Sequence, residues 1–381
     1  MDVEPQRGPA EDLVHRCRAV LEEAWREDPG FCVPNGMVYP HQWLWDSCFH
    51  SLAWTALGDR RGVVELRSAL ANQDQSSGFI PHMSYWDDPA VHADFWGRPD
   101  LSTITQPPMF GHAVAMAIRA GFAVEDDLTQ RAISGIAHLL IDRPKIAGLV
   151  CVLHPWETGC DDSARWDDWC PGGFEPEQWR RTKADLVAAL HFEPSVGYPI
   201  GSSAFQVPSV GFNALLAWNS FELLSVGAGE PHRARADELV AAIADRWDQS
   251  LRTWTDADSG SGVVRTLDGL LPLLVDPRDE AFDDLLDPAT YGAAFGPCGV
   301  HRDEPSYDPE QYWRGPSWPQ LTYLLAVAGR RAGRHDVADT LMASLRSAAR
   351  NNGFAEYWHP DTGAPGGANP QTWTTLAAVP V

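Results

Sequence analysis

Apolar residues recur along most of the chain with the spacing of amphipathic helices. Between residues 10 and 26 they return at intervals of three and four positions, which puts them on one face of a helix. These residues are Leu13, Cys17, Val20, Leu21, Ala24 and Trp25. The same spacing predicts helices over residues 42–57, 61–73, 107–121, 125–141, 177–191, 207–228, 232–250, 316–331 and 335–350.

The predicted helices follow one another with short turns, which is typical of helical hairpins. The last two are separated by GRRAGR, residues 329–334, whose glycines suit a helix C-terminus. Alternation with a period of two is scarce, and its best example, Gly262–Leu267, is a weak strand prediction. We therefore expect an all-α fold of about a dozen helices in successive antiparallel pairs.

Four long loops rich in Trp, Pro, Gly and Asp interrupt this pattern, over residues 74–106, 143–176, 192–206 and 289–315. Loops of this length are uncommon in a compact domain unless they carry function. No linker or break in composition divides the chain, so residues 1–381 are expected to form a single domain. Helical hairpins alone fit a closed toroid or an open solenoid. The loops favour the toroid, because they can gather over one central mouth.

Composition narrows the classes of function. The 29 Lys and Arg residues against 52 Asp and Glu give a net charge of −23, which opposes binding to nucleic acid or an anionic membrane. The N-terminus lacks a secretory pattern, and no apolar run is long enough to span a bilayer. We expect a soluble cytoplasmic protein that takes a small-molecule substrate, and homo-oligomerisation stays open.

The cysteines and acidic runs give weak signals. Seven cysteines without a CxxC pair predict reduced thiols, and the spacing of Cys151, Cys160 and Cys170 does not match a zinc site. The segment Asp256–Gly260 begins like a calcium loop but lacks the later ligands, so it predicts a turn. Asp276–Asp287 predicts a solvated acidic helix. These residues therefore give no reason to expect a metal site.

Tryptophan is the unusual residue: its 17 copies exceed 14 Phe and 8 Tyr. Three of them lie in residues 154–169, HPWETGCDDSARWDDW, beside several carboxylates. Desolvation beside indole raises the pKa of a carboxyl, and a carboxyl that keeps its proton near neutral pH can act as a general acid. The alternative is a solvated acidic loop, but such a loop has little need of three indoles.

A second acid among aromatic residues follows the last predicted helix, in residues 353–363, GFAEYWHPDTG. Glu356 is there a candidate for a perturbed carboxylate. The alternative is a helix end followed by a turn. Glu356 lies 195 residues from Asp161, so the two acids can face each other only if the chain closes on itself.

Further aromatic and amide groups lie where loops turn into predicted helices. The segments are Trp43-Leu44-Trp45-Asp46-Ser47, Gln106-Pro107-Pro108 and Tyr312-Trp313-Arg314-Gly315-Pro316-Ser317-Trp318-Pro319. Aromatic faces stack on the C–H faces of pyranose rings, and carboxylate, amide and guanidinium groups hydrogen-bond sugar hydroxyls. Each Trp alone is better explained as core, but together the junctions favour a sugar site.

These residues resemble a known family. Residues 157–166, ETGCDDSARW, are similar to the E-[ST]-G-x-D-x-S-x-R-W segment of glycoside hydrolase families 63 and 37, inverting α-glycosidases that include mannosylglycerate and glucosylglycerate hydrolases and trehalases. The junction segments, residues 354–363 and Thr372-Trp373-Thr374 match further family motifs in the same order, over residues 43–375.

The resemblance implies an (α/α)6 barrel without a cofactor, with Asp161 as general acid and Glu356 as general base. It also implies that the glycone subsite is lined by Trp45, Asp46, Gln106, Arg165, Trp313 and Arg314. From the same segments we expect substrate contacts from Trp43, Trp156, Glu157, Gly159, Gly315, Trp318, Tyr357 and Trp373. Inverting hydrolysis requires such a pair of carboxyl groups, with roughly 6.5–9.5 Å between them.

The compact length resembles that of the glycosylglycerate hydrolases, so glucosylglycerate or mannosylglycerate is the expected substrate. Arg181, beside Arg180 in QWRRTKADL, resembles the family position that meets the glycerate carboxylate. A neutral α-glucoside such as trehalose, or a sugar-binding protein without catalysis, stays open. Two features depart from the pattern: Cys160 stands where trehalases carry Trp, and the chain ends at Val381, so the last barrel helix is expected to be short.

Overall fold

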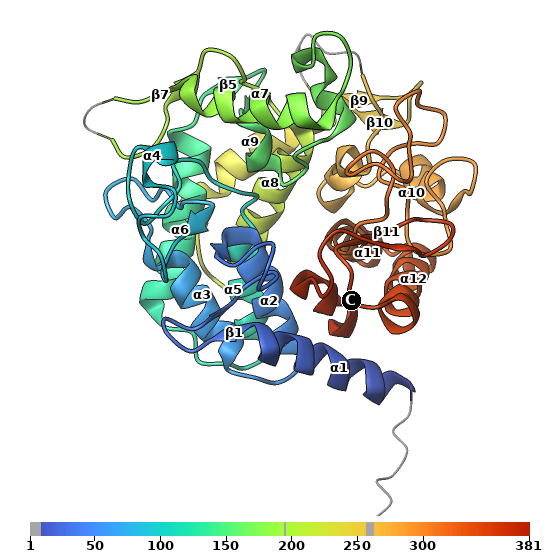
Figure 1. The fold of residues 1–381 in the computed structure, drawn as a ribbon, viewed down its shortest axis with the longest axis horizontal. Helices are drawn as coiled ribbons and strands as arrows, with labels where there is room; N and C mark the ends of the chain where they lie inside the picture. The colour runs from blue at the N-terminus through green and yellow to red at the C-terminus, as the bar shows by residue number, and fades with distance from the viewer. Residues whose placement is uncertain (1–8, 194–195, 257–262) are drawn as a thin grey trace, which may run out of the picture.

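The computed structural model describes residues 9–193, 196–256 and 263–381, and most of its regular structure is helical (Figure 1). The α-helices are α1 (Pro9–Ala24), α2 (Leu44–Ala56), α3 (Arg61–Ala71), α4 (Ala93–Trp96), α5 (Phe110–Arg119), α6 (Asp126–Ile141), α7 (Pro176–Ala188), α8 (Val210–Ser225), α9 (Arg233–Ala244), α10 (Asp279–Leu286), α11 (Pro319–Arg331) and α12 (His335–Asn352). The 3₁₀-helices are η1 (Pro155–Thr158), η2 (Ala164–Trp169), η3 (Glu230–His232), η4 (Leu267–Leu274) and η5 (Thr372–Ala378). The helical class predicted from the sequence is confirmed.

Six of these elements contact one another in cyclic order. Helix α2 packs against α5, α5 against α8, α8 against η4, η4 against α11, α11 against η5, and η5 against α2. Each has a second partner outside it. Five of these partners follow their inner element in the chain: α3, α6, α9, α10 and α12 pack against α2, α5, α8, η4 and α11, respectively. The sixth partner comes from the other end of the chain, since α1 packs against η5. The contacts therefore form a closed inner ring with an outer ring around it, and the red C-terminal segment meets the blue N-terminal helices (Figure 1).

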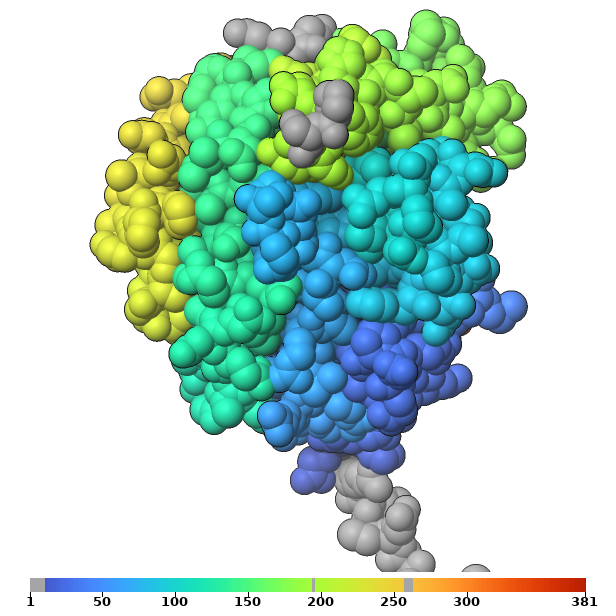
Figure 2. Space-filling model, turned by 90° about the vertical axis from the view of Figure 1, so that its left-hand side faces the viewer, coloured from blue at the N-terminus to red at the C-terminus, as the bar shows by residue number. Residues whose placement is uncertain are grey.

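The elements of the inner and outer rings differ in how much of their surface is buried. In the inner helix α2 every residue from Leu44 to Thr55 is buried, because neighbours cover it on all sides. The outer helix α12 buries only one stripe, formed by Val337, Ala338, Leu341, Met342, Leu345, Ala348 and Ala349. The outer helices α3 and α6 lie side by side on the surface, as their blue and blue-green atoms show in Figure 2. Outer helices thus show the amphipathic period that the sequence reveals.

The strands are short and occur as two-stranded antiparallel ribbons. The pairs are β1 (Trp25–Arg26) with β2 (Phe31–Cys32), β3 (Gln42–Trp43) with β4 (Met83–Ser84), β5 (Lys145–Ile146) with β6 (Leu149–Val150), β7 (Leu190–His191) with β8 (Gly201–Ser202), β9 (Trp247–Asp248) with β10 (Thr253–Trp254), and β11 (Tyr357–Trp358) with β12 (Pro365–Gly366). All of these strands lie in segments between helices.

Several sequence predictions need correction. The strand predicted over Gly262–Leu267 is wrong, since residues 263–265 form no strand, Thr266 makes one bridge to Val300, and Leu267 begins η4; Gly262 lies outside the described residues. The acidic helix α10 forms but is not fully solvated, because Ala281, Phe282, Asp284 and Leu285 are buried. Of the turn predicted at Asp256–Gly260, residues 257–260 lie outside the described part.

All seven cysteines are buried and unpaired, which confirms the prediction of free thiols. Cys151, Cys160 and Cys170 do not gather into a metal-ligand group among the described residues. No helix in the described part of the chain combines the length and the apolarity needed to cross a membrane.

Candidate active site

The loops at one end of the ring enclose a cavity that holds both candidate carboxylates. Its walls are Pro34, Tyr39, Trp43, Trp45, Asp46, Gln106, Gly159, Asp161, Tyr312, Trp313, Glu356, Gln371 and Trp373. Most of these residues stand at the start of an inner element: Asp46 in the first turn of α2, Gln106 just before α5, Trp313 before α11 and Trp373 in η5. Because the inner elements begin at the same end, residues distant in sequence meet there.

Asp161 lies on the turn between η1 and η2, at the edge of the cavity. Its backbone carbonyl accepts a hydrogen bond from Trp179 Nε1 at 3.0 Å. Burial raises the pKa of Asp161 to about 6, against an opposing effect of the Lys183 ammonium and a further raising effect of Asp162 and Glu356. A carboxyl with this pKa holds a usable fraction of its proton near neutral pH, as a general acid must.

Glu356 lies between α12 and β11 and is almost fully buried. Its Oε1 accepts hydrogen bonds from the hydroxyls of Tyr39 at 3.1 Å and Tyr312 at 2.9 Å, and its Oε2 accepts one from the Ala368 amide at 2.8 Å. Burial raises the pKa of Glu356, and these three bonds oppose that rise. They fix the carboxylate and leave one acceptor position on Oε2.

Asp46 adds a third carboxyl to the cavity wall. Burial raises its pKa to about 7, while His50, one helical turn further along α2, acts to lower it. Its buried Oδ1 has no hydrogen-bond partner among the described residues. A buried polar atom without a partner is costly, so a sugar hydroxyl is a fitting partner for Oδ1.

Indole rings form the apolar walls. Trp313 faces the cavity and stacks on the buried Trp318, with ring centroids 3.5 Å apart and an angle of 3° between the planes. Trp45 and Trp373, which both line the cavity, pack edge to face with centroids 6.0 Å apart. Trp45 also packs over Gly159, whose φ of +70° and lack of a side chain allow this approach. Rigid aromatic faces of this kind suit the C–H faces of a pyranose.

Nine of the predicted site residues line this cavity: Trp43, Trp45, Asp46, Gln106, Gly159, Asp161, Trp313, Glu356 and Trp373. Trp156, Gly315, Trp318 and Tyr357 lie outside the lining. Tyr357 packs against Tyr312 and Trp318, and Trp156 stacks on His82, so both aromatic side chains support the wall or its surroundings.

Three polar residues that were predicted to contact the substrate form ion pairs with other protein side chains. Glu157 is fully buried, pairs with Arg143 and accepts the Leu153 and Thr105 amides at 2.7 and 3.2 Å. The other two are Arg165, which joins Asp256 and Asp268, and Arg314, which joins Asp167 and lies 3.6 Å from the centroid of Phe174. None of these three residues lines the cavity, and each has its charge in an ion pair within the protein.

Arg181 is exposed on α7 and is not part of the cavity lining, and its neighbour Arg180 pairs with Glu177 at 3.6 Å on the surface. Conversely, Pro34, Tyr39, Tyr312 and Gln371 line the cavity although the sequence did not single them out as site residues. Tyr312 belongs to a recognised aromatic segment and could have been found there. The others stand in irregular segments with no periodic signal.

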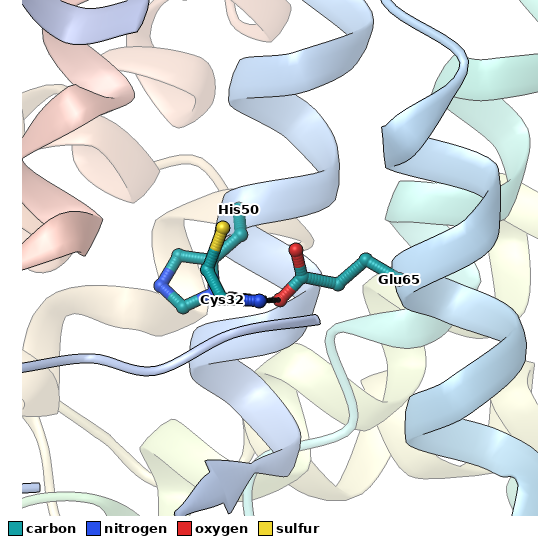
Figure 3. Close-up of side chains that lie close together, drawn as sticks. All are labelled: Cys32, His50 and Glu65. Carbon is teal, nitrogen blue, oxygen red and sulfur yellow. Dashed lines mark hydrogen bonds and ion pairs between the residues drawn. The ribbon is translucent and has the colours of Figure 1, made fainter. Parts of the chain in front are cut away.

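Behind the cavity, Cys32, His50 and Glu65 form a fully buried cluster that could hold a metal ion (Figure 3). Glu65 Oε1 accepts the Cys32 amide at 3.1 Å and lies 2.7 Å from His50 Nδ1, and His50 Nε2 lies 2.6 Å from Thr372 Oγ1. Both ring nitrogens of His50 thus have partners, and burial raises the pKa of the Cys32 thiol well above its usual range. These residues fit a hydrogen-bond network between α2, α3, β2 and η5 better than a metal site.

Known proteins are similar to this chain over most of its length. Residues 39–374 match the family described as mannosylglycerate hydrolase MGH1-like glycoside hydrolase domain. Mannosylglycerate hydrolase from Thermus thermophilus is 29% identical, over 92% of this chain and 96% of its own length. Glucosylglycerate hydrolase from Mycolicibacterium hassiacum is also 29% identical, over 90% of this chain and 92% of its own length.

A crystal structure of the family 63 mannosylglycerate hydrolase from Thermus thermophilus, in complex with Tris and D-glycerate, superposes with a TM-score of 0.83 at 26% identity. The superposition covers 96% of this chain and 99% of that one. The fold, the cavity with its two carboxylates and the family match across most of the chain agree: this protein is a glycoside hydrolase and belongs to the mannosylglycerate hydrolase MGH1-like family.

Proposed function

We propose that this enzyme hydrolyses a small α-glycoside with inversion at the anomeric carbon, with Asp161 as general acid and Glu356 as general base. The observation that carries the proposal is that both carboxyl groups line one aromatic cavity, and that the pKa of Asp161 is raised to about 6. Two carboxyl groups with separate environments are what this chemistry requires.

In the proposed reaction, Asp161 gives its proton to the glycosidic oxygen as the bond from that oxygen to the anomeric carbon breaks. Glu356 takes a proton from a water molecule whose oxygen attacks the anomeric carbon from the opposite face. Solvent exchange then returns a proton to Asp161 and removes one from Glu356. The bonds from Tyr39 and Tyr312 to Glu356 Oε1 support this role, since they orient the carboxylate toward the attacking water.

For the substrate we propose a 2-O-α-glycosyl glycerate, either mannosylglycerate or glucosylglycerate. The support is the similarity to a mannosylglycerate hydrolase and a glucosylglycerate hydrolase over nearly their full lengths. The glycerate carboxylate then needs a cation, and the candidate is Arg181 on the exposed face of α7.

A neutral α-glucoside such as trehalose is the second candidate, and one observation favours it. None of the described residues that line the cavity is Lys or Arg, and Arg165 and Arg314 are already paired with carboxylates. A cavity without a free cation suits an uncharged aglycone.

We further propose that the closed contacts of α2, α5, α8, η4, α11 and η5 make the chain one (α/α)6-barrel domain over residues 1–381. The proposal includes a cytoplasmic location and no nucleic-acid partner, in line with the net charge of −23.

A hydrolysis screen tests the substrate proposal. The full chain is incubated with mannosylglycerate, glucosylglycerate and trehalose at equal concentration, and free hexose is measured over time. We expect hexose release from one or both of the glycosylglycerates and at least tenfold less from trehalose. Arg181→Gln raises KM for the glycosylglycerate and leaves the rate with trehalose unchanged. A preference for trehalose contradicts the glycerate proposal and supports the second candidate.

A further inference from the structure

Helix α7 contacts the segment of the general acid through two side chains one turn apart. Trp179 donates its Nε1 hydrogen to the backbone carbonyl of Asp161 at 3.0 Å, and Lys183 forms an ion pair with Asp162 Oδ1. Residues four apart on a helix share a face, so both contacts come from the same side of α7. One contact fixes the backbone of Asp161, and the other fixes the side chain next to it.

Lys183 is an unusual residue for this position, because it is buried. Only 7% of its surface is exposed, and its ammonium lies 5.9 Å from the ring centroids of both Trp156 and Trp179. Asp162 is also largely covered, with 15% of its side chain exposed. Burying two charges costs desolvation energy that their attraction barely offsets, so such a pair contributes little net stability. In surroundings of low polarity, however, its field on a neighbouring carboxyl is strong.

The charged groups that act on Asp161 come from several elements. Lys183 on α7 favours the ionised form, whereas Asp162 on the same loop and Glu356 after α12 oppose it. Tyr39 and Tyr312 also face Asp161, but burial raises the pKa of both phenols, so they are neutral at working pH. Cys160 is neutral for the same reason. Lys183 is thus the cation that counteracts two carboxylates.

We infer that the Lys183–Asp162 ion pair tunes and positions the general acid: Lys183 acts on Asp161 through its charge, and Asp162 acts in the opposite sense. This inference rests on the proposed role of Asp161. It assigns to two residues that do not line the cavity a share in setting the pH range over which the enzyme works.

The sign of each effect follows from the charges. Lys183→Met removes the cation, so Asp161 keeps its proton to higher pH and the alkaline limb of kcat/KM moves up by roughly one pH unit. Asp162→Asn removes a neighbouring anion and leaves Lys183 in place, so the same limb moves down. The double variant returns close to the wild-type limb. A purely structural role predicts lower activity in each variant without opposite shifts.

Asp46 also has a raised pKa, but the groups that act on it are His50, Glu356 and Glu65, and neither Lys183 nor Asp162 is among its main causes. Opposite shifts in the two variants therefore report on Asp161. The chain's only other lysine, Lys145, is exposed in β5 and gives a matched control. Lys145→Met removes the same charge from the protein and is expected to leave the profile unchanged.

The test is the pH profile of kcat/KM for the full chain and these variants, on whichever of the three screened glycosides the wild type hydrolyses. Thermal melting shows whether each variant is folded, and Lys183→Arg is expected to restore the wild-type limb. Should Lys183→Met fail to fold, Asp162→Asn alone decides, because it must move the limb to lower pH. Shifts in the same direction, or no shift in Asp162→Asn, overturn the inference.

A second readout separates this inference from the proposed function. The carboxyl ¹³C resonance of Asp161, identified by its loss in Asp161→Asn, is titrated in each variant without substrate. Opposite displacements of its titration support the tuning even if Asp161→Asn retains turnover, a result that removes the proposed catalytic role instead. Unchanged titration in both variants overturns the inference while leaving the proposed function intact.

Discussion

At the scale of single residues, the two proposed catalytic carboxyl groups differ in how they are held. Glu356 receives three hydrogen bonds, from Tyr39, Tyr312 and the Ala368 amide, and these favour its ionised form. Burial is the largest effect on both groups and raises the pKa of each; Asp161 has no such set of three bonds, and its pKa is raised to about 6. The three bonds to Glu356 stabilise its carboxylate form and so suit the role of a base, whereas the raised pKa of Asp161 suits the role of an acid.

Removing a phenol from Glu356 tests this assignment. In Tyr312→Phe one stabilising hydrogen bond to the carboxylate is lost, so the pKa of Glu356 rises further. Because the base must be ionised, the acid limb of kcat/KM moves to higher pH, and the rate at the optimum falls about tenfold. Tyr198→Phe, outside the cavity lining, serves as control. An acid limb that stays in place or moves to lower pH contradicts the role of Glu356.

The sequence predicts some of these residues and misses others for a physical reason. Trp45 and Trp313 lie in aromatic segments at loop–helix junctions, and these segments together predict a sugar site. The guanidinium of Arg165 could hydrogen-bond sugar hydroxyls, but no pattern in the sequence indicates that it forms ion pairs with Asp256 and Asp268. Tyr39 lies alone in an irregular segment, and only the fold brings its hydroxyl to Glu356.

At the scale of elements, backbone turns set the positions of the cavity walls. Gly159 ends η1 in the left-handed conformation, and a Cβ there would collide with the indole of Trp45.

The burial of each element explains whether its hydrophobic pattern can be recognised in the sequence. Outer helices show an amphipathic period, whereas η4 is buried along its whole length, contains Pro272 and has no polar face to give a period. No apolar period predicts the inner element η5 either; a short last helix was expected there from the family resemblance alone.

Gly159→Ala separates backbone strain from the collision. Gly97 has nearly the same backbone angles, with φ 68° against 70°, but open space where its Cβ would lie. Both alanine variants carry a left-handed strain of about 1–2 kcal/mol. Only Gly159→Ala also displaces Trp45, so we expect it to lower the melting temperature further and to reduce kcat/KM at least tenfold. Equal melting temperatures and activities in the two variants contradict the packing of Trp45 on Gly159.

At the scale of the whole molecule, inner elements are tied together by buried polar groups. Glu222 on α8 accepts hydrogen bonds from His112 at 2.9 Å and Arg119 at 2.6 Å on α5, and pairs with Arg331 on α11 at 3.3 Å. His50 on α2 and Thr372 on η5 connect the first and last inner elements. The sequence predicts a closed ring from its hairpins and loops, but these cross-ring partners follow from the fold alone.

The Glu222 network predicts acid sensitivity. Burial alone would raise the pKa of Glu222, but the bonds from His112 and Arg119 outweigh it and lower the pKa to about 2, from 4.5. The stability it provides is complete above pH 4.5 and is lost as the pH falls toward 2, by about 3 kcal/mol in total. Denaturant unfolding across this range measures the loss. In Glu222→Gln the free energy of unfolding is lower at pH 7 and falls less steeply; an equally steep fall contradicts the assignment.

The central claim is inverting hydrolysis by Asp161 and Glu356, and the configuration of the first sugar released tests it most directly. Proton NMR during the first minutes of hydrolysis resolves the anomeric signals before mutarotation mixes them. From an α-glycoside the enzyme is predicted to release the β-anomer first, with no such signal from Asp161→Asn or Glu356→Gln. Initial release of the α-anomer, or wild-type turnover in either variant, would contradict the mechanism.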